Sequence, residues 1–171
     1  MEVYVEPIIP KLTLVVIGAG HVGMQVVHLA HWLGYRVVVN DDRPEFANPE
    51  SMPEADEYIH SNMAELPKKM DINEFTCLIL TTRGGDVDID GLSPLLDTEA
   101  GYIGVIGSRR RWEFTKKGLI AKGVDPEKFK KVHSPIGLEL KAETPEEIAV
   151  SIIAEVMMNA NRATGLSMKK D

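Results

Sequence analysis

The sequence predicts an α/β fold, a doubly wound and mostly parallel sheet of six strands in the order 3-2-1-4-5-6, with helices on both faces. Three observations support this prediction. Short apolar runs alternate with amphipathic segments along the chain, as in repeated strand–helix units. A glycine-rich turn directly follows the first apolar run. Glycine, hydroxyl and charged residues follow the later runs, where the carboxyl ends of parallel strands meet at one edge of a sheet.

The first strand–helix–strand unit spans residues 12–43. An apolar strand at 14–17 leads into the sequence Gly-Ala-Gly-His-Val-Gly at 18–23, and a helical pattern follows. A second apolar strand at 37–39 then runs into Asp41. Strand, glycine turn, helix, strand and acid follow one another here as in a Rossmann-like dinucleotide-binding unit, so the unit predicts a nucleotide site.

Each residue of the glycine turn has an expected role. Gly18 allows the tight turn off the strand, and Gly23 lets the helix pack closely on it. Gly20 has no Cβ, so a pyrophosphate can approach the backbone. The helix begins at His21 and Val22, where free amides and the helix dipole attract phosphate. We therefore expect these five residues to hold a phosphate group.

The acid after the second strand predicts which dinucleotide binds. Asp41 follows Gly18 by 23 residues, a position from which a carboxylate accepts hydrogen bonds from an adenosine ribose. Its negative charge repels a 2′-phosphate, which favours NAD over NADP. Arg43 is suited to bind that phosphate instead, and Asp42 lies between the two. The alternative is a domain that keeps the fold and binds no nucleotide.

The rest of the chain repeats the strand–helix alternation. Strands are expected at 55–60, 76–80, 102–106 and 132–136, and helices at 63–70, 89–96, 111–122 and 126–131. The last helix has the strongest local signals: Thr144 is its expected N-cap, Pro145 occupies the first helical position, and Glu147 completes a capping box. The expected organisation is an extended segment at 1–11, one Rossmann-like domain at 12–164 and a flexible tail at 165–171.

Two later strand ends add polar residues to the same edge of the sheet. These residues are Thr82, Arg83, Gly107, Ser108 and Arg109. Because ligands of doubly wound sheets bind outside the carboxyl ends of the strands, we expect these residues to complete the rim of an anion site. Ser108 and Arg109 come first after their strand and are placed to meet a phosphate or carbonyl group, whereas residues 110–111 are expected to make surface contacts.

Composition excludes several classes of protein. The chain has 171 residues, 44% of them hydrophobic and 26% charged, which is typical of one soluble domain. A net charge of −7 argues against nucleic acid or anionic membrane as partner. Cys77, the single cysteine, excludes a disulfide within the chain. No signal peptide or long apolar run is evident, so the expected location is cytoplasmic. The sequence shows no metal-ligand spacing, and a homodimer is expected from base rates.

Six segments support a more specific interpretation. In order they read EVYVEPIIPKLTLVVIGAGHVG, DDRPEFANP, PEADEYI, TTRGG, YIGVIGSRRR and HSPIGLELKAETPEEIAVSIIAE. Together they resemble the xanthine dehydrogenase accessory family, XdhC/CoxI, over its dinucleotide-binding-like carboxyl-terminal domain. The resemblance implies a maturation factor for a molybdenum hydroxylase that binds molybdenum cofactor (molybdopterin), takes part in its sulfuration with a cysteine desulfurase, and delivers it to the apoenzyme. It implies no catalytic residue.

The chain departs from that family pattern in two places. The family sequence TRGH reads Thr82-Arg83-Gly84-Gly85 here, so any role of that histidine is absent. Family members also carry an additional amino-terminal domain, whereas this sequence starts at the connecting segment 2–10, so we expect a separate amino-terminal XdhC/CoxI-type domain as partner. Two alternatives remain: a small NAD(P)-dependent oxidoreductase, for which no acid–base pair is visible, and a nucleotide-sensing regulatory domain.

Overall fold

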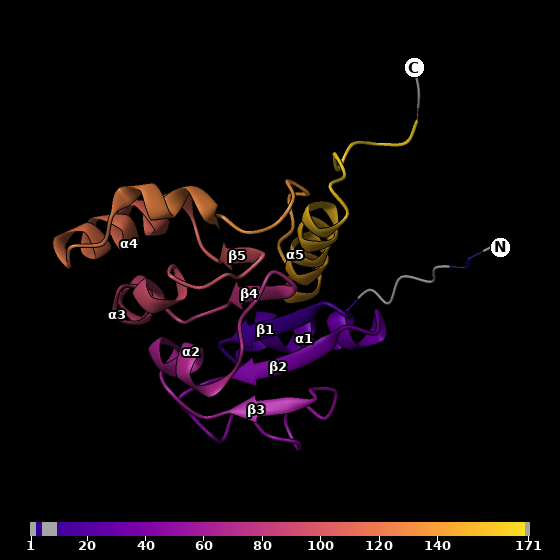
Figure 1. Ribbon diagram of the computed structural model, residues 1–171, viewed down its shortest axis with the longest axis horizontal. Helices are drawn as coiled ribbons and strands as arrows, with labels where there is room; N and C mark the ends of the chain where they lie inside the picture. Colours follow the sequence, from indigo (N-terminus) through magenta and orange to yellow (C-terminus); the bar gives the residue numbers. More distant parts are fainter. Residues whose placement is uncertain (1–2, 5–9, 170–171) are drawn as a thin grey trace.

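A computed structural model of the protein describes residues 3–4 and 10–169. These residues form one six-stranded sheet in the order β3-β2-β1-β4-β5-β6, in which every paired strand is parallel to its neighbour. The strands are β1 (Thr13–Ile17), β2 (Arg36–Asn40), β3 (Glu57–Ile59), β4 (Thr76–Leu80), β5 (Tyr102–Val105) and β6 (Val132–His133). The predicted fold class and strand order are therefore confirmed, and Figure 1 shows the strands following one another from β3 at the bottom of the view upwards.

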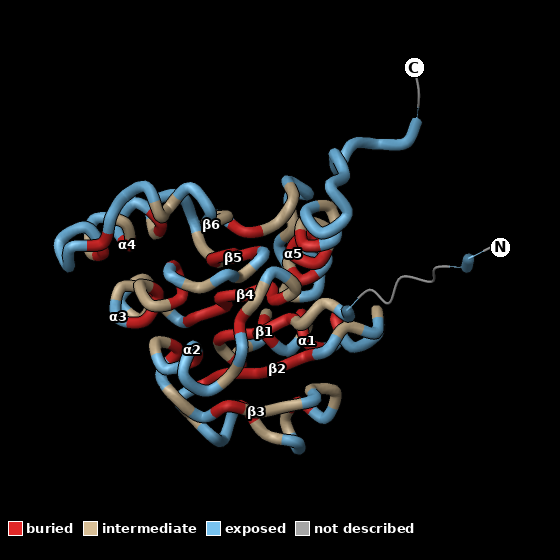
Figure 2. Tube along the Cα trace, viewed as in Figure 1, coloured by how far each residue is buried: buried red, intermediate tan, exposed pale blue. Residues whose placement is uncertain are grey.

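Helices cover both faces of the sheet. They are α1 (His21–Trp32), α2 (Leu66–Lys69), α3 (Gly85–Leu95), α4 (Arg109–Ala121) and α5 (Pro145–Ala160), with 3₁₀ turns at Met63–Glu65 and Pro126–Lys131. Alternate residues of β1 point to opposite faces. Leu14 and Val16 pack in one core with α1 and α5, while Val15 and Ile17 pack in a second core with α2, α3 and α4. The central strands are mostly apolar because both of their faces are buried, and Figure 2 shows this burial along the sheet.

Strand register decides which residues meet at the carboxyl edge. Ile17, the last residue of β1, lies opposite Asn40 at the end of β2 and opposite Leu80 at the end of β4. The three strands therefore end level with one another. Consequently the turn at 18–23, the acids after β2 and the loop after β4 all begin at the same place, although 64 residues separate Ile17 from Thr81 along the chain.

Several element boundaries differ from the sequence-based expectation. Helix α4 begins at Arg109 rather than at residue 111, because the Ser108 hydroxyl accepts a hydrogen bond from the Arg111 amide and caps the helix. Helix α3 begins at Gly85 rather than at residue 89, with two acids in its first turn. Strand β6 ends at His133, short of the expected 136, and β3 is also shorter than expected.

The capping prediction for the last helix is confirmed. Thr144 accepts a hydrogen bond from the Glu147 amide, the Glu147 carboxylate accepts one from the Thr144 amide, and Pro145 is the first helical residue. Residues 165–169 form no helix or strand. Most of the expected extended segment at 1–11, and residues 170–171 of the tail, lie outside the described residues. In the part of the chain that the structure describes, no helix is long and apolar enough to cross a membrane.

Candidate functional site

A cavity of about 220 Å³ lies at the carboxyl edge of the sheet, over the end of β1 and between the ends of β2 and β4. This is the point at which the strand order reverses, where doubly wound proteins bind ligands. We call it the β1 pocket. Seven residues predicted from the sequence line it: Gly18, Gly20, Asp41, Asp42, Arg43, Thr82 and Arg83.

The other predicted site residues do not line the β1 pocket. His21, Val22 and Gly23 form the first turn of α1, and His21 is exposed to solvent. Residues 107–109 lie at the start of α4, where Ser108 serves as the N-cap. The structure therefore brings together the residues that follow β1, β2 and β4, and leaves those that follow β5 outside the cavity.

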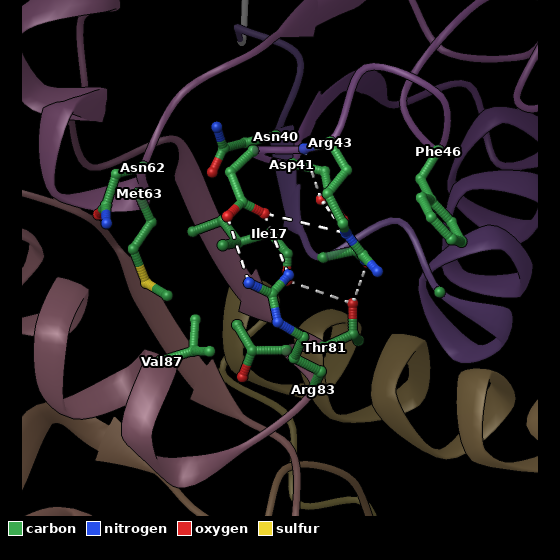
Figure 3. A pocket seen from close by; sticks show the side chains of 14 residues that line it. Ile17, Asn40, Asp41, Arg43, Phe46, Asn62, Met63, Thr81, Arg83 and Val87 are labelled. Atoms are coloured by element: carbon green, nitrogen blue, oxygen red, sulfur yellow. Dashed lines mark hydrogen bonds and ion pairs between the residues drawn. The ribbon is translucent and has the colours of Figure 1, made fainter.

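Sequence reasoning missed half of the pocket lining. The additional residues are Ile17, Asn40, Phe46, Asn62, Met63, Thr81 and Val87. Most of them are apolar or sit in loops whose path depends on the tertiary structure. In Figure 3, Arg83 lies between Met63 and Val87 on one side and Arg43 and Phe46 on the other. The pocket therefore combines two guanidinium groups with apolar side chains, as a ligand with an anionic part and a planar ring requires.

The glycine turn separates glycines that the fold needs from one that it does not. Gly18 has φ +106°, and a Cβ there would lie 2.7 Å from the Thr81 carbonyl oxygen. A Cβ on Gly23 would lie 2.1 Å from the Gly18 carbonyl oxygen. Gly20 has φ −82°, which any residue adopts, and a Cβ there would meet no atom within 4 Å. Packing of the chain therefore explains Gly18 and Gly23, whereas Gly20 opens onto free space.

That free space adjoins the amino-terminal end of α1. Gly20 is the N-cap and has no side chain to accept hydrogen bonds from the first amides of the helix, and the first turn contains no acidic residue. These amides, together with the positive end of the helix dipole, favour an anion. The geometry is thus suited to a phosphate group placed against Gly20.

Asp41 is fully engaged by neighbouring groups. Its Oδ2 accepts hydrogen bonds from the Ala19 amide at 2.8 Å and from Arg43 Nη2 at 3.0 Å. Its Oδ1 accepts from the Arg43 amide at 3.0 Å and from Arg43 Nε at 2.9 Å. Burial alone would raise the pKa of Asp41, but the Arg43 side chain and the two amides outweigh it and lower the pKa to about 2. The carboxylate therefore ties the glycine turn to the end of β2.

These hydrogen bonds leave no acceptor site of Asp41 free for the expected ribose contact. A carboxylate offers about four acceptor sites, and those of Asp41 are already used. A ribose hydroxyl gains access to Asp41 only if Arg43 moves. The ribose role of Asp41 stays a prediction, and the structure adds a positioning role that the sequence did not indicate.

A second ion pair, between Arg83 and Asp42, crosses the pocket. Arg83 Nη1 and Nη2 donate to the Asp42 carboxylate at 3.1 Å and 3.2 Å, and both side chains are 52% exposed. Arg43 in turn lies over the Phe46 ring, 3.9 Å from its centroid. Two acids and two arginines thus balance the charge of the pocket.

The loop after β4 is fixed by a buried cluster of hydrogen-bonded side chains, Thr82, Asp88 and Arg111. The Asp88 carboxylate is fully buried; it accepts a hydrogen bond from the Thr82 hydroxyl, and from Arg111 Nη2 at 2.7 Å. Arg111 also donates to the Thr82 carbonyl at 3.2 Å. The expectation of a surface position for Arg111 is wrong. The sequence contains one sign that Asp88 is buried: it shares the helical spacing of the buried residues Leu92 and Leu95.

Comparisons with known proteins agree with this architecture. The XdhC Rossmann domain matches residues 14–156. The chain is 32% identical over 171 residues to the uncharacterized protein YqeB of Escherichia coli K12, with 99% of this chain and 31% of YqeB covered. It is 31% identical over 161 residues to a probable xanthine dehydrogenase subunit of Bacillus subtilis 168, with 94% of this chain and 47% of that protein covered.

A solved structure is also similar. The crystal structure of a xanthine dehydrogenase from Bacillus halodurans matches with a TM-score of 0.78 and 33% identity, over 90% of this chain and 45% of that one. The sheet order, the glycine turn and the cavity beside it define a Rossmann-type domain. The chain belongs to the XdhC family, and residues 14–156 are its Rossmann domain. It spans less than half the length of each of these three relatives.

Proposed function

We propose that this protein is an accessory factor in the maturation of a molybdenum hydroxylase of the xanthine dehydrogenase type, and that the β1 pocket binds a phosphate-bearing cofactor. The main support for a bound cofactor is the open space at Gly20. This residue opens onto free space in front of the uncapped end of α1, where the fold itself has no need of glycine. A backbone free of side chains at that point lets a phosphate reach the helix amides.

Two groups of pocket residues support a ligand with a phosphate and a planar ring. Arg83 has the fork geometry that binds phosphate through paired hydrogen bonds, and Arg43, paired with Asp41, adds a second positive charge to the lining. Phe46, Met63 and Val87 offer apolar surface to an adenine, nicotinamide or pterin ring. NAD, NADP and the molybdenum cofactor all have this composition, and NAD is favoured over NADP by the acid at 41.

The proposed partners follow from family membership. A relative and a solved structure carry the name xanthine dehydrogenase, so the proposed client is the apoenzyme of such a hydroxylase. Further proposed partners are a cysteine desulfurase and an amino-terminal XdhC/CoxI-type domain, as the resemblance to the XdhC/CoxI family implies. A homodimer is proposed on base rates.

A small NAD(P)-dependent oxidoreductase is the second candidate, supported by the glycine turn and the acid after β2. Hydride transfer to a carbonyl usually needs a proton donor beside the reacting atom. Among the described residues that line the β1 pocket, the titratable side chains are two aspartates and two arginines, all held in ion pairs. This lining favours binding over acid–base catalysis, and equally suits a nucleotide-sensing domain.

The test is to purify the protein gently from a host that makes molybdenum cofactor and to identify the released small molecules by mass spectrometry. The Gly20→Val variant, purified in parallel, is the control for contaminants. A stoichiometric pterin with the wild type alone, and a co-purifying hydroxylase, support the proposal. Nicotinamide dinucleotide without pterin or hydroxylase would favour the oxidoreductase or sensor. Equal recovery from both proteins would remove the β1 pocket from consideration.

A further inference from the structure

We propose that Arg83 receives a phosphate of the ligand and that Asp42 masks Arg83 until the ligand arrives. Binding then exchanges one anion for another: the phosphate takes the place of the Asp42 carboxylate, while the Asp41–Arg43 pair stays closed. This inference rests on the proposed binding of an anionic cofactor in the β1 pocket, and it names the residues that determine affinity.

Three ion pairs lie in the pocket: Arg43 with Asp41, Arg83 with Asp42, and a longer one of 3.9 Å between Arg43 Nε and Asp42. The first two differ in the properties that decide whether a pair opens. The Asp41 carboxylate is 3% exposed and receives four hydrogen bonds, two of them from backbone amides. Asp42 and Arg83 are each 52% exposed, and the structure joins them by two hydrogen bonds of 3.1 Å and 3.2 Å alone. Removing Arg43 from Asp41 would leave a buried charge unpaired, whereas water can replace either partner of the exposed pair.

The exposed pair also lies where the ligand must pass. Asp42 follows β2 and Arg83 follows β4, so their bond, 41 residues apart in sequence, joins the two strands that flank β1. Both residues line the β1 pocket, whose volume of about 220 Å³ is below the roughly 300–1,000 Å³ of typical ligand sites. An extended dinucleotide crosses the same edge, from the end of β2 towards β4. Opening the pair enlarges the site along that path.

The backbone beside Arg83 is held in place during such an exchange. Arg111 donates two hydrogen bonds to the Thr82 carbonyl, and the Thr82 hydroxyl donates to the buried Asp88. The residue before Arg83 is therefore fixed to α3 and α4. Exchange of partners needs only a rotation of the Arg83 side chain, and a guanidinium pairs with a phosphate at least as well as with a carboxylate.

The experiment is isothermal titration of the full chain with NAD⁺, and separately with inorganic pyrophosphate, which carries the phosphates without rings. Asp42→Asn unmasks Arg83 and should tighten binding about three- to fivefold, the strength of one exposed ion pair. Arg83→Gln should weaken binding about tenfold or more, because charge-assisted hydrogen bonds are lost. In the double variant, Asp42→Asn should bring no gain, since Arg83 is absent and Arg43, the other cation near Asp42, stays paired with Asp41.

The matched control is Glu50→Gln, which removes one negative charge from the same exposed loop after β2 but from outside the pocket lining. Its affinity for the ligand should equal that of the wild type. An increase in affinity like that of Asp42→Asn would show a general charge effect and overturn the proposed exchange of Asp42 for phosphate at Arg83. A further outcome is that Gly20→Val abolishes binding while the Asp42 and Arg83 variants leave it unchanged. That result would support the proposed site and overturn this inference. No binding of either probe, by wild type or Asp42→Asn, would overturn this inference, whereas the proposed function is decided by the released cofactor and the co-purifying hydroxylase.

Discussion

The substitution Gly20→Val separates ligand binding from folding more cleanly than any other change in the glycine turn. Gly20 has a φ of −82°, which valine adopts without backbone strain, and a Cβ there would have no atom within 4 Å. The residue is the N-cap of α1, where glycine is a better cap than an apolar residue. We expect a stability loss of roughly 0.5–1 kcal/mol and an intact fold.

The expected loss of binding is much larger. A side chain at Gly20 occupies the space in front of the α1 amides and keeps a phosphate from reaching them. Each hydrogen bond to a charged group contributes about 1.5–3 kcal/mol, so the loss of two weakens binding by about 3 kcal/mol or more. That difference corresponds to a loss of affinity of roughly a hundredfold or more.

Urea unfolding and isothermal titration with NAD⁺ measure the two effects on the same samples. The matched control is Gly84→Val, because Gly84 is the N-cap of α3, has extended backbone and open space around its Cβ, and does not line the β1 pocket. Both variants should lose similar stability, but only Gly20→Val should lose affinity. Unchanged affinity in a folded Gly20→Val protein would refute the placement of phosphate at this turn.

Three further predictions concern stability and reactivity. The pKa of Asp41 is lowered from 3.8 to about 2, so its pairing stabilises the fold by about 2 kcal/mol above pH 4 and this contribution is lost as the pH falls through 2. Urea unfolding of wild type and Asp41→Asn should converge towards pH 2, and a constant difference from pH 6 to 2 would contradict the pairing. Arg111→Met leaves the Asp88 carboxylate buried without a cation, and should cost about 3–5 kcal/mol in urea unfolding at pH 7; a loss under about 1 kcal/mol would argue against the cluster. Burial raises the pKa of the Cys77 thiol to about 11, so an aromatic disulfide reagent at pH 8 should label it only as fast as the protein opens, and rapid labelling of the native protein would show that the thiol is accessible.

The parts of the fold that sequence reasoning predicted correctly are those with local causes. The capping box at residues 144–147 depends on side chains three positions apart, and the turn at 18–23 depends on glycines within one short segment. Strand order followed from the alternation of strands and helices, since right-handed crossovers leave few arrangements for such a chain. These features were open to prediction because each is decided by a short stretch of sequence or by a general rule of chain topology.

The start of α4 was predicted two residues too late, although the residue that caps the helix directly precedes it. Three consecutive arginines at 109–111 disfavour a helix start on dipole grounds, yet Ser108 caps the helix and Arg111 is neutralised by Asp88. The compensating partner lies in another helix, so the sequence of α4 alone does not show how this positive charge is balanced.

The candidate site also has features with local causes and features that depend on distant parts of the chain. The glycine turn, the acids after β2 and the polar loop after β4 could be recognised from the sequence, because each directly follows an apolar strand. Three features became visible only in the folded chain. The Asp41 carboxylate accepts hydrogen bonds from Ala19 and Arg43, Asp42 pairs with Arg83 across β1, and the residues after β5 lie outside the pocket. The reason is physical: these pairings join segments up to 41 residues apart, and the register that ends β1, β2 and β4 level with one another sets which side chains come within hydrogen-bonding distance.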